Sequence, residues 1–487
     1  MSYSRDETGL QALILCGPGT SFDTLLKPEG TPKCLALVAN RPMVYYQMNL
    51  CRRLGVTDVT LVTFPSAVAP IKAALQHDPF VGSFPSAKVL APQDLEETTS
   101  TAQIIRLPEV QDCIKGNFLL LPCDLVCELD QRLLDSWDLS QFQSPQELNG
   151  GLGLYYQTEA DIKDEVSDLV AVAPFEQSEM PGAAKYKLSR LVMSMGMNST
   201  KARLEQDKAF LVRFSLTKKH QRIKIMTDYR DAHLYFFPHW VKHLVRHQEK
   251  IGSVKEDLIG LWAKAQWQQG LAEKLGMDKC RSPQDPHKWI SGQSMSSTVY
   301  QKPRTNSLGS ESFRVEMPPF MACLLEGGTE LVRRVDSPAL LLSTSLRLAK
   351  LESIGTAKDV STRSPFAHAH KITSPDGIAQ RSFISRDDCL LASNVVVEKG
   401  CSIKETCIGP GSKICSGARL TRCVVLENVI IGARCVLVGC VIGNRSSVGS
   451  NSTLNDCEVQ EGFTVPERTE AKNEIFTPLL EDLLDNM

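Results

Sequence analysis

A repeat of aliphatic residues near the C-terminus constrains this chain more than any other feature of its sequence. Aliphatic residues recur from residue 391 to residue 465 at successive steps of six, six and five, so one period is 17 residues. Three short strands per period, each stacked on the equivalent strand about 4.8 Å away, form a triangular prism. The repeat therefore predicts a parallel β-helix with these inward side chains: Leu391, Val397, Ile403, Ile408, Ile414, Leu420, Val425, Ile431, Leu437, Ile442, Val448, Leu454, Val459 and Val465.

Two further patterns agree with this prism. Glycine follows the aliphatic residue on four sides, as expected where backbones approach closely or leave the usual φ range: Gly409, Gly432, Gly443 and Gly449. Small residues occupy a second inward set of positions, where a narrowing corner admits little volume: Cys401, Cys407, Ser412, Ala418, Cys435, Ser446 and Ser452. The alternative, an antiparallel sandwich of short strands, would not keep one phase over so many positions.

Composition sets broad limits on the function. The 16 cysteines lack the paired spacing of a zinc site, and half of them lie between residues 389 and 457, so we interpret them as small packing residues. A chain of 487 residues is expected to form about two or three domains. The net charge of −2 excludes a global attraction to nucleic acid or anionic lipid. A polar N-terminus and the lack of long apolar runs predict a soluble, cytosolic protein that is not exported.

The N-terminal half has the pattern of an α/β domain. An apolar run at residues 11–15 ends in a loop that contains Gly17 and Gly19. Such a loop either presents backbone N–H groups to phosphates or is a plain turn between a strand and a helix. Further apolar runs alternate with helical segments, which predicts a mostly parallel sheet with strands at residues 59–63, 87–90, 118–121 and 153–156.

The order of motifs in this half resembles the sugar-nucleotide pyrophosphorylase family. The glycine loop is followed by Thr31, Pro32 and Lys33, then by a helix, and later by Asp124 at the end of an apolar strand. The resemblance implies a Rossmann-like nucleotidyltransferase domain in which Lys33 binds phosphate, while Asp124 and Asp231 hold a magnesium ion during phosphoryl transfer.

Several residues depart from the family pattern. Ser21 stands where the family has an arginine, Pro18 removes an N–H donor from the loop, and a glycine-threonine-alanine segment is replaced by residues 100–102. Losing the arginine that stabilises a transferring phosphate costs orders of magnitude in rate. We therefore expect no catalytic residue, no metal and no cofactor, but a vestigial nucleotide-binding set: Gly17, Gly19, Lys33, Asp124 and Asp231.

Each member of this set also has a structural interpretation. Lys33 is then a solvated turn residue, Asp124 caps a turn, and Asp231 begins a strand.

The C-terminal prism resembles the hexapeptide-repeat family, and this resemblance implies a left-handed β-helix. Many such helices are acyltransferases that use a histidine as general base. No histidine follows His370 in this chain. We therefore expect the prism to serve as a scaffold or docking surface.

A closer resemblance covers nearly the whole chain. Residues 119–126 (LLLPCDLV), 231–235 (DAHLY) and 253–262 (SVKEDLIGLW), together with the β-helix, resemble the nucleotidyltransferase-like subunits of the translation initiation factor two-B family. The resemblance implies a role in guanine-nucleotide exchange on translation initiation factor two. It also implies as partners an epsilon subunit that supplies catalysis and a regulatory core of beta and delta subunits.

The sequence divides into five segments: 1–267, the nucleotidyltransferase-like domain; 268–315, a linker or surface loop; 316–385, a connecting segment; 386–466, the β-helix; and 467–487, a tail with helically spaced leucines that predict a capping helix. Within the connecting segment, residues 320–325 and 330–335 are expected to form a hairpin, and residues 340–352 a strand and a helix.

A basic stretch at residues 201–224 is either a solvated insertion or a contact for an acidic partner, and direct RNA contact is not expected.

Three functions are compatible with these sequence features. The first is a non-catalytic subunit of a guanine-nucleotide exchange factor. The second is an active sugar-1-phosphate nucleotidyltransferase, and the third is a free-standing scaffold protein. Loss of the loop arginine favours the first over the second.

Overall fold

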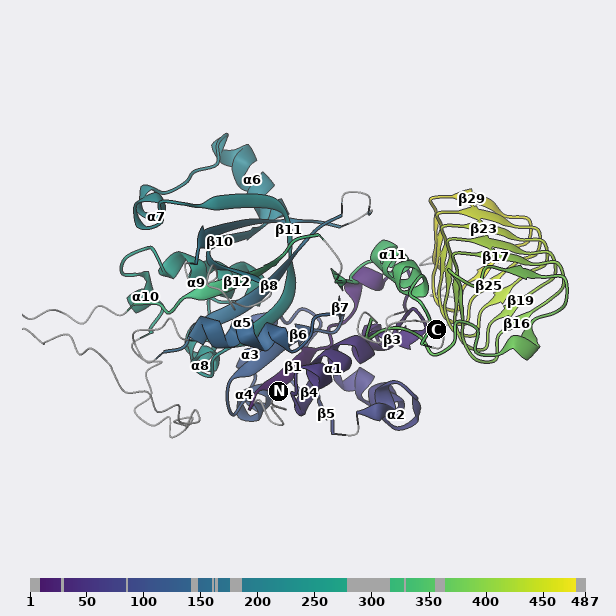
Figure 1. Ribbon diagram of the computed structural model, residues 1–487, viewed down its shortest axis with the longest axis horizontal. Coiled ribbons are helices and arrows are strands. Elements are labelled where there is room, and N and C mark those ends of the chain that lie inside the picture. The colour runs from purple at the N-terminus through teal and green to yellow at the C-terminus, as the bar shows by residue number, and fades with distance from the viewer. Residues whose placement is uncertain are drawn as a thin grey trace, which may run out of the picture.

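The computed structural model describes residues 9–27, 30–84, 86–141, 148–159, 162, 165–175, 186–277, 316–327, 330–354 and 364–478. Figure 1 shows two bodies, a layered α/β domain formed by the N-terminal part of the chain and a triangular prism formed by the C-terminal part. The helix α11 (Pro338–Ala349) lies between them. The predicted fold class, α/β followed by a left-handed parallel β-helix, is confirmed.

A nine-stranded sheet forms the centre of the N-terminal domain, in the order β5-β4-β1-β6-β11-β8-β12-β10-β9. It is parallel from β5 to β6, whereas β11 runs antiparallel to β6, β8 and β9. The sheet is therefore mixed, and the prediction of a mostly parallel sheet holds only for the half that carries the glycine loop. Its strands are β1 (Gln11–Leu15), β4 (Asp58–Val62), β5 (Lys88–Leu90), β6 (Phe118–Pro122), β8 (Gly151–Gln157), β9 (Asp168–Pro174), β10 (Lys187–Gly196), β11 (Lys224–Phe237) and β12 (Phe320–Leu325).

Helices cover both faces of this sheet, so its central strands are apolar throughout instead of alternating. In β6, Leu119 and Leu121 pack into the cluster that contains α1, whereas Phe118 and Leu120 pack on the opposite face with α3, α4 and α8. The helices are α1 (Met43–Arg53), α2 (Val68–His77), α3 (Thr101–Arg106), α4 (Pro108–Cys113), α5 (Arg132–Gln141), α6 (Met197–Asp207), α7 (Phe214–Lys219), α8 (Trp240–His247), a π-helix at Val254–Ile259, α9 (Gly260–Ala265) and α10 (Leu271–Lys274).

The segment after residue 316 returns to this sheet instead of only connecting two domains. The strand β12 lies between β8 and β10, and β13 (Val332–Arg334) pairs with β7 (Leu125–Cys127). The predicted hairpin of residues 320–325 with 330–335 is therefore wrong, because an apolar pattern specifies a strand but not its partner. Residues 340–349 lie in the helix α11 and form no strand. The N-terminal domain thus extends well beyond residue 267.

The predicted linker at residues 268–315 is described only up to residue 277. In that part, α10 packs on the domain through buried Ala272, Leu275 and Met277. Residues 278–315 lie outside the described residues.

The prism confirms the repeat in register. Each strand pairs in parallel with the strand one coil further on, so that Leu391, Ile408, Val425 and Ile442 lie one above another. All fourteen predicted aliphatic side chains are buried in one core, each at most 2% exposed. Three sheets form the sides: β14-β17-β20-β23-β26-β29, β15-β18-β21-β24-β27-β30 and β16-β19-β22-β25-β28.

The short strands of the prism are β14 (Phe383–Ile384), β15 (Leu390–Leu391), β16 (Val396–Val397), β17 (Ser402–Lys404), β18 (Cys407–Ile408), β19 (Lys413–Ile414), β20 (Arg419–Thr421), β21 (Val424–Val425), β22 (Ile430–Ile431), β23 (Val436–Val438), β24 (Val441–Ile442), β25 (Ser447–Val448), β26 (Thr453–Asn455), β27 (Glu458–Val459), β28 (Thr464–Val465), β29 (Glu470–Lys472) and β30 (Ile475–Phe476). The β-helix is therefore longer than the predicted 386–466. Residues 467–478, assigned to the tail, add the strands β29 and β30, which are two of the three sides of a further coil. The predicted helix of leucines after residue 478 lies outside the described residues.

The corners explain the glycine pattern. Gly409, Gly432, Gly443 and Gly449 have no positive φ, but a Cβ on any of them would stand 2.5 to 2.7 Å from the next coil's backbone. Close approach is therefore the reason for these glycines. Other residues adopt the left-handed conformation, and they recur every 17 residues. Examples with φ between 54° and 70° are Asn394, Gly411, Asn428, Arg445 and Gly462.

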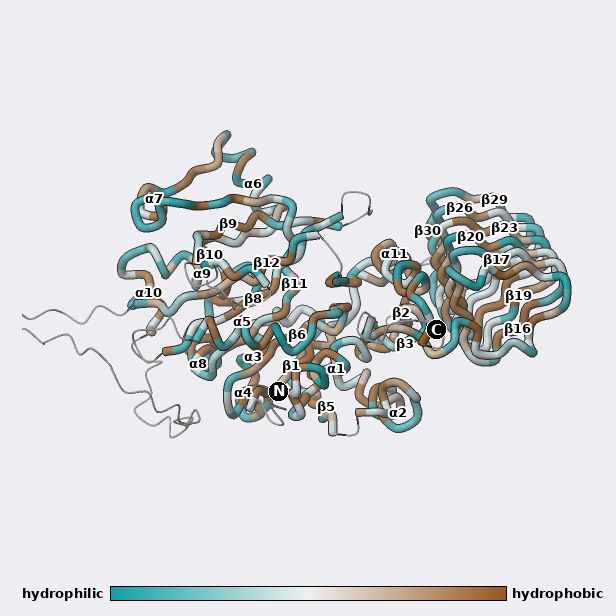
Figure 2. Tube along the Cα trace, in the orientation of Figure 1, coloured by the Kyte–Doolittle hydropathy of each residue, from teal (hydrophilic) through white to brown (hydrophobic). Residues whose placement is uncertain are grey.

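One side of the prism docks on the N-terminal domain. On the sheet that starts with β15, the outward residues Leu390, Cys407, Val424 and Val441 are buried in the N-terminal core cluster. Figure 2 shows that β2 (Leu37–Val38) and β3 (Arg41–Pro42), which meet the prism here, are apolar in part. Cys407, predicted to point inward, instead faces α11, where its Sγ donates to the Ser345 carbonyl at 3.6 Å. Its strand pair places Ile408 inward, so Cys407 must point outward.

No helix in the described part of the chain is both long and apolar enough to cross a membrane.

Adjacent isoleucines in β22 provide a test of the inward phase. Ile431 is fully buried and Ile430 is 51% exposed. We expect Ile431→Ala to lower the free energy of unfolding of the prism by about 2 to 5 kcal/mol, because it leaves a cavity in a stacked core. The matched control Ile430→Ala should change it by about 0.5 kcal/mol. Urea denaturation followed by circular dichroism measures both, and equal losses would contradict the assigned phase.

Candidate functional site

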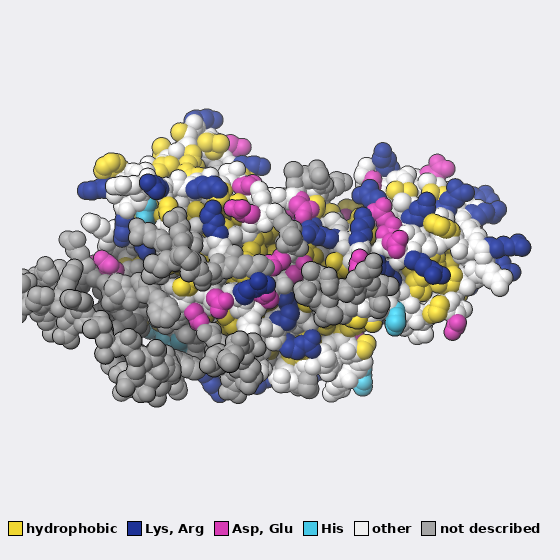
Figure 3. Space-filling model, in the orientation of Figure 1, with side chains coloured by type: hydrophobic (Ala, Val, Ile, Leu, Met, Phe, Trp, Pro, Cys, Tyr) yellow, Lys and Arg dark blue, Asp and Glu magenta, His cyan; other side chains and the backbone are white. Residues whose placement is uncertain are grey.

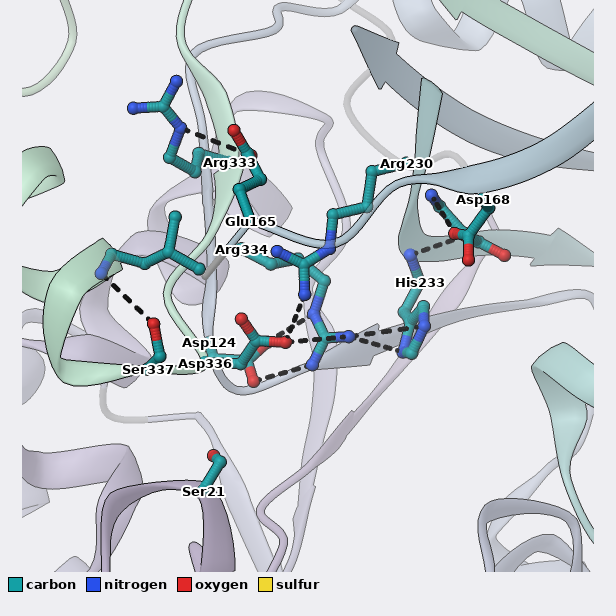
Figure 4. Close-up of polar contacts among 12 residues, drawn as sticks. Ser21, Asp124, Glu165, Asp168, Arg230, His233, Arg333, Arg334, Asp336 and Ser337 are labelled. Atoms are coloured by element: carbon teal, nitrogen blue, oxygen red, sulfur yellow. Dashed lines mark hydrogen bonds and ion pairs between the residues drawn. The ribbon is translucent and has the colours of Figure 1, made fainter. Parts of the chain in front are cut away.

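Two cations hold a buried carboxylate at the end of β6. Asp124 is 2% exposed, and its carboxylate accepts hydrogen bonds from Lys33 Nζ at 2.8 Å and from Arg334 Nε and Nη2 at 2.9 and 2.8 Å. Figure 4 shows the Arg334 guanidinium lying against this carboxylate. The contact of Arg334 is bidentate, which is the strongest geometry for such a pair. Both carboxylate oxygens are therefore engaged by side chains of the protein itself.

Local structure explains why these three side chains meet. Lys33 begins the 3₁₀ turn Lys33–Leu35, and Asp124 follows β6 in a turn. Arg334 ends β13, which is held beside Asp124 by the hydrogen bond from Val335 N–H to the Asp124 carbonyl at 2.7 Å. The structure brings two of the predicted site residues, Lys33 and Asp124, together, and it adds Arg334, which the sequence did not indicate. Arg334 is more than 200 residues away from Asp124 and lies in no motif.

The electrostatics favour the charged pair. Burial would raise the pKa of the Asp124 carboxyl, but Arg334 and Lys33 lower it well below its ordinary value. Burial would likewise lower the pKa of Lys33, yet the Asp124 carboxylate outweighs this effect and raises it. Lys33 is 8% exposed, so it is not a solvated turn residue. A buried carboxylate and its cations thus remain ionised together.

Further charged groups extend the network. Nη1 of Arg334 lies 3.1 Å from Nδ1 of His233, and Nη1 also stands 3.7 Å from the carboxylate of Asp336. Asp336 in turn pairs with Arg230. Burial and the neighbouring Arg334 lower the pKa of His233 well below its ordinary value, so the imidazole is neutral and accepts from the guanidinium. The network has more basic than acidic groups.

Asp231, the second predicted metal ligand, serves its own strand. It is fully buried in β11, and its carboxylate accepts from the Tyr235 hydroxyl at 2.5 Å and from the His233 N–H at 2.8 Å. These bonds stabilise a bulge at which His233 has a φ of +54°. Burial raises the pKa of Asp231 to about 6. The geometry thus agrees with the structural interpretation of Asp231, and no contact joins it to Asp124.

The glycine loop lies beside Lys33. Gly19 has a φ of +87°, and a Cβ there would stand 3.0 Å from Cβ of Lys33, so glycine is needed for both reasons. Gly17 is exposed, and a Cβ there would meet nothing within 4 Å. Ser21 is exposed, 3.4 Å from Lys33 Nζ, and brings no charge. The role of these residues in nucleotide binding stays a prediction.

The residues at this site do not fit the magnesium that the pyrophosphorylase resemblance implies. Both oxygens of Asp124 are taken by cations, and both oxygens of Asp231 accept from donors of its own strand. Two cationic side chains beside Asp124 would repel a divalent ion. Among the described residues, no group of three or more His, Cys, Asp or Glu side chains could hold a metal.

The segment that replaces the family's glycine-threonine-alanine has a structural function. Ser100 and Gln103 form a capping box at the start of α3, and the Ser100 hydroxyl donates to the Gly252 carbonyl at 2.5 Å. The Thr101 hydroxyl accepts from the Val254 N–H at 2.9 Å. This segment therefore anchors the motif at residues 253–262 against α3.

The prism holds the chain that follows the glycine loop. The Thr24 hydroxyl donates to Glu458 at 2.5 Å, and Thr31 donates through its N–H and its hydroxyl to Glu461 at 3.2 and 3.1 Å. Asn444 donates to the Thr31 hydroxyl at 3.0 Å. Thr31 is two residues before Lys33, so the loop, the lysine and the prism form one connected unit.

We expect Arg334→Met to lower the free energy of unfolding by about 3 to 5 kcal/mol, because it leaves the buried Asp124 carboxylate short of a partner. The control Arg132→Met removes an ion pair with Asp130 whose side chains are 53% and 41% exposed, and should cost at most about 1 kcal/mol. Urea denaturation measures both variants. Similar losses of unfolding free energy in the two variants would mean that the buried Arg334–Asp124 ion pair stabilises the protein no more than an exposed ion pair does.

The pH dependence of stability follows from the same pair. The pKa of Asp124 is lower in the folded than in the unfolded protein, so its contribution is present above pH about 4 and is lost as the pH falls through the folded-state pKa. Removing Arg334 raises that folded-state pKa. Acid titration followed by near-ultraviolet circular dichroism should therefore show that Arg334→Met loses tertiary structure at a higher pH than the parent protein. Coincident curves would contradict the role of Arg334.

Glu461 provides a test of the link between the loop and the prism. It is 2% exposed and binds Thr31 and Arg445. Glu461→Ala should lower the opening free energy of the Thr31 amide by about 1 to 3 kcal/mol, measured by hydrogen exchange. The exposed Glu467 provides the control, and Glu467→Ala should leave that amide unchanged. Unchanged exchange in Glu461→Ala would show that the loop is held by other contacts.

The fold is an α/β domain followed by a left-handed parallel β-helix, and the carboxylate at its candidate site is bound by cations of the chain itself. A family model described as "GMPPB C-terminal domain" matches residues 385–478, which are the prism. The chain is also similar to translation initiation factor eIF2B subunit gamma of Schizosaccharomyces pombe, with 27% identity over 270 residues. That match covers 55% of this chain and 54% of the relative, so the chain spans about half the length of the relative it matches. The resemblance stated from the sequence is confirmed.

Proposed function

We propose that this chain is a non-catalytic, gamma-type subunit of translation initiation factor two-B. In this role it supports an epsilon-type subunit, which accelerates GDP release from translation initiation factor two. One observation carries the non-catalytic part of the proposal. The carboxylate of Asp124, which the pyrophosphorylase resemblance assigns to magnesium, is bound by Arg334 and Lys33. Similarity to the yeast gamma subunit supports the assignment to this factor.

Guanine-nucleotide exchange makes no demand for a catalytic side chain. An exchange factor binds the nucleotide-free protein more tightly than the GDP-bound protein, which is a coupling between two affinities and involves no bond chemistry. A subunit contributes by holding its partner in the productive arrangement. The buried hydrogen bonds of Asp124 with Lys33 and Arg334 hold three segments of the chain together, which suits that task.

The proposed partners are an epsilon subunit, a core of beta and delta subunits, and translation initiation factor two as the substrate, all in the cytosol. The prism is proposed as a docking surface. The side formed by the sheet that starts with β16 carries the exposed apolar residues Val396 and Ile430, 44% and 51% exposed. Apolar groups of this kind favour protein contacts over solvent.

Release of labelled GDP from translation initiation factor two tests this function. The rate is measured with an epsilon-type partner alone, with this chain alone, and with both together. We expect stimulation only when both are present. Exchange by this chain alone, or an unchanged rate on adding it to the partner, would contradict the proposal.

A second assay addresses the alternative, an active sugar-1-phosphate nucleotidyltransferase. The purified chain is incubated with nucleoside triphosphates, sugar 1-phosphates and magnesium, and pyrophosphate is measured. We expect none, because the acidic site is filled by Arg334 and Lys33. Sustained pyrophosphate release would overturn the non-catalytic assignment even if the chain also assembles into a complex.

A further inference from the structure

A surface far from the charged network is both apolar and basic. It is formed by α6, by the loop at residues 208–213, by α7 and by the start of β11, and we call it the α6–α7 surface. Five large apolar side chains on it are 41% to 78% exposed: Leu204, Leu211, Val212, Phe214 and Ile225. In the space-filling view, yellow and dark blue groups gather over α6 and α7 (Figure 3). Leaving such residues in solvent has a free-energy cost that a partner removes.

The same surface has a strong positive charge. Residues 201–224 contain two acidic residues, Glu205 and Asp207, against eight basic ones: Lys201, Arg203, Lys208, Arg213, Lys218, Lys219, Arg222 and Lys224. The whole chain has a net charge of −2, so this positive charge is a local feature. Local charge of one sign steers and orients a partner of the opposite sign.

The basic groups of the surface are not neutralised within the described structure. None of the eight forms an ion pair with a carboxylate of a described residue. Their repulsion reaches neighbouring groups. Burial, Arg213 and Arg203 together lower the pKa of Lys264, and burial, Arg190 and Lys219 lower the pKa of His220 to about 4. Carboxylates from outside the chain would relieve this repulsion.

The α6–α7 surface is fixed to the domain by contacts of α7, unlike a solvated loop. Leu216 of α7 is buried in a small cluster with Trp267, and Lys219 Nζ donates to the Gln266 carbonyl at 2.6 Å. Arg213 contacts Gln268 at 3.4 Å. One side of α7 is thus anchored to the domain, while Phe214, 78% exposed, points away from it. An anchored helix presents the same groups to a partner each time, which lowers the entropy lost on binding.

We propose that the α6–α7 surface is a docking site for an acidic segment of another protein that carries leucine-like apolar side chains. Charge complementarity selects the acidic residues of the partner, and the exposed apolar groups select its aliphatic ones. The inference goes beyond the proposed function, because it holds whichever protein assembly contains the chain.

The composition of the surface favours a protein over the other polyanions. Single-stranded RNA is bound by rows of aromatic side chains, and Phe214 is the one aromatic residue among the five exposed apolar groups. Insertion into an anionic membrane needs an apolar face along one helix. Here the apolar groups come from two helices, a loop and a strand, and α7 has six residues.

The experiment uses the full chain, tagged and purified with its bound partners from cells. A carbodiimide that joins amines to carboxylates is applied, and cross-linked peptides are identified by mass spectrometry. We expect cross-links from Lys218 and Lys219 to aspartates or glutamates of another protein. Acetylation of the five lysines of the surface should be about tenfold slower in the assembly than in the isolated chain, as expected for groups buried by a contact.

Matched variants separate docking from folding. Lys218→Glu with Arg222→Glu, at two exposed positions that lack the anchoring hydrogen bond of Lys219, places like charges opposite the partner and should weaken its retention by about 10- to 100-fold. Phe214→Ser should weaken it about tenfold without changing the unfolding midpoint, since this side chain is exposed. The control Lys72→Glu with Lys250→Glu alters exposed lysines elsewhere and should have no effect.

Three results would overturn the inference. The five lysines could react equally in the assembly and in the isolated chain, which would show that nothing covers the surface. Their protection could disappear on treatment with ribonuclease, which would identify RNA as the occupant. The chain could bind phosphatidylserine vesicles through Lys218 and Lys219, which would identify a membrane. If the cross-linked partner is no initiation-factor protein, the docking site stands and the proposed function fails.

Discussion

The ion pairs of the buried Asp124 carboxylate hold together three segments of the N-terminal domain, and one of these segments leads to the prism. They join the end of β6 to the lysine that follows the glycine loop and to the end of β13. The chain continues from β13 into α11, which packs against the strands β18 and β21 of the prism. Because an unpaired carboxylate at this depth is strongly disfavoured, the three segments must stay together for the domain to be stable. Asp124, to which the pyrophosphorylase resemblance assigns a magnesium ion, is here the residue that holds these segments together.

The arrangement at Asp124 differs from the one that the pyrophosphorylase resemblance implies. The pyrophosphorylase resemblance places a metal between carboxylates, whereas Arg334 here supplies positive charge from within the chain. The chain after the glycine loop is likewise held, because Thr24 and Thr31 bind Glu458 and Glu461 of the prism. These hydrogen bonds tie the segment that follows the glycine loop to the prism.

The prediction of the prism succeeded because its rules are local. An inward aliphatic residue recurs along the sequence itself, and stacking at a fixed period leaves one possible partner for each strand. All fourteen inward positions could therefore be predicted. Cys407 was misplaced, because it directly precedes the inward Ile408 in β18 and so points outward, toward α11. The strand β12 shows the opposite case, since its apolar pattern was visible but its place between β8 and β10 depends on residues that are distant in sequence.

The sequence by itself determined the fold class and the period and phase of the prism. Only the tertiary structure decided that Asp124 is bound by Arg334, that Asp231 stabilises a bulge in its own strand, and that the prism holds the loop. The physical reason is the range of the interactions. Hydrophobic periodicity depends on residues that are close in the sequence. A buried charge, in contrast, can pair with any residue that folding brings within a few ångströms, and Asp124 pairs with Arg334, which is 210 residues away.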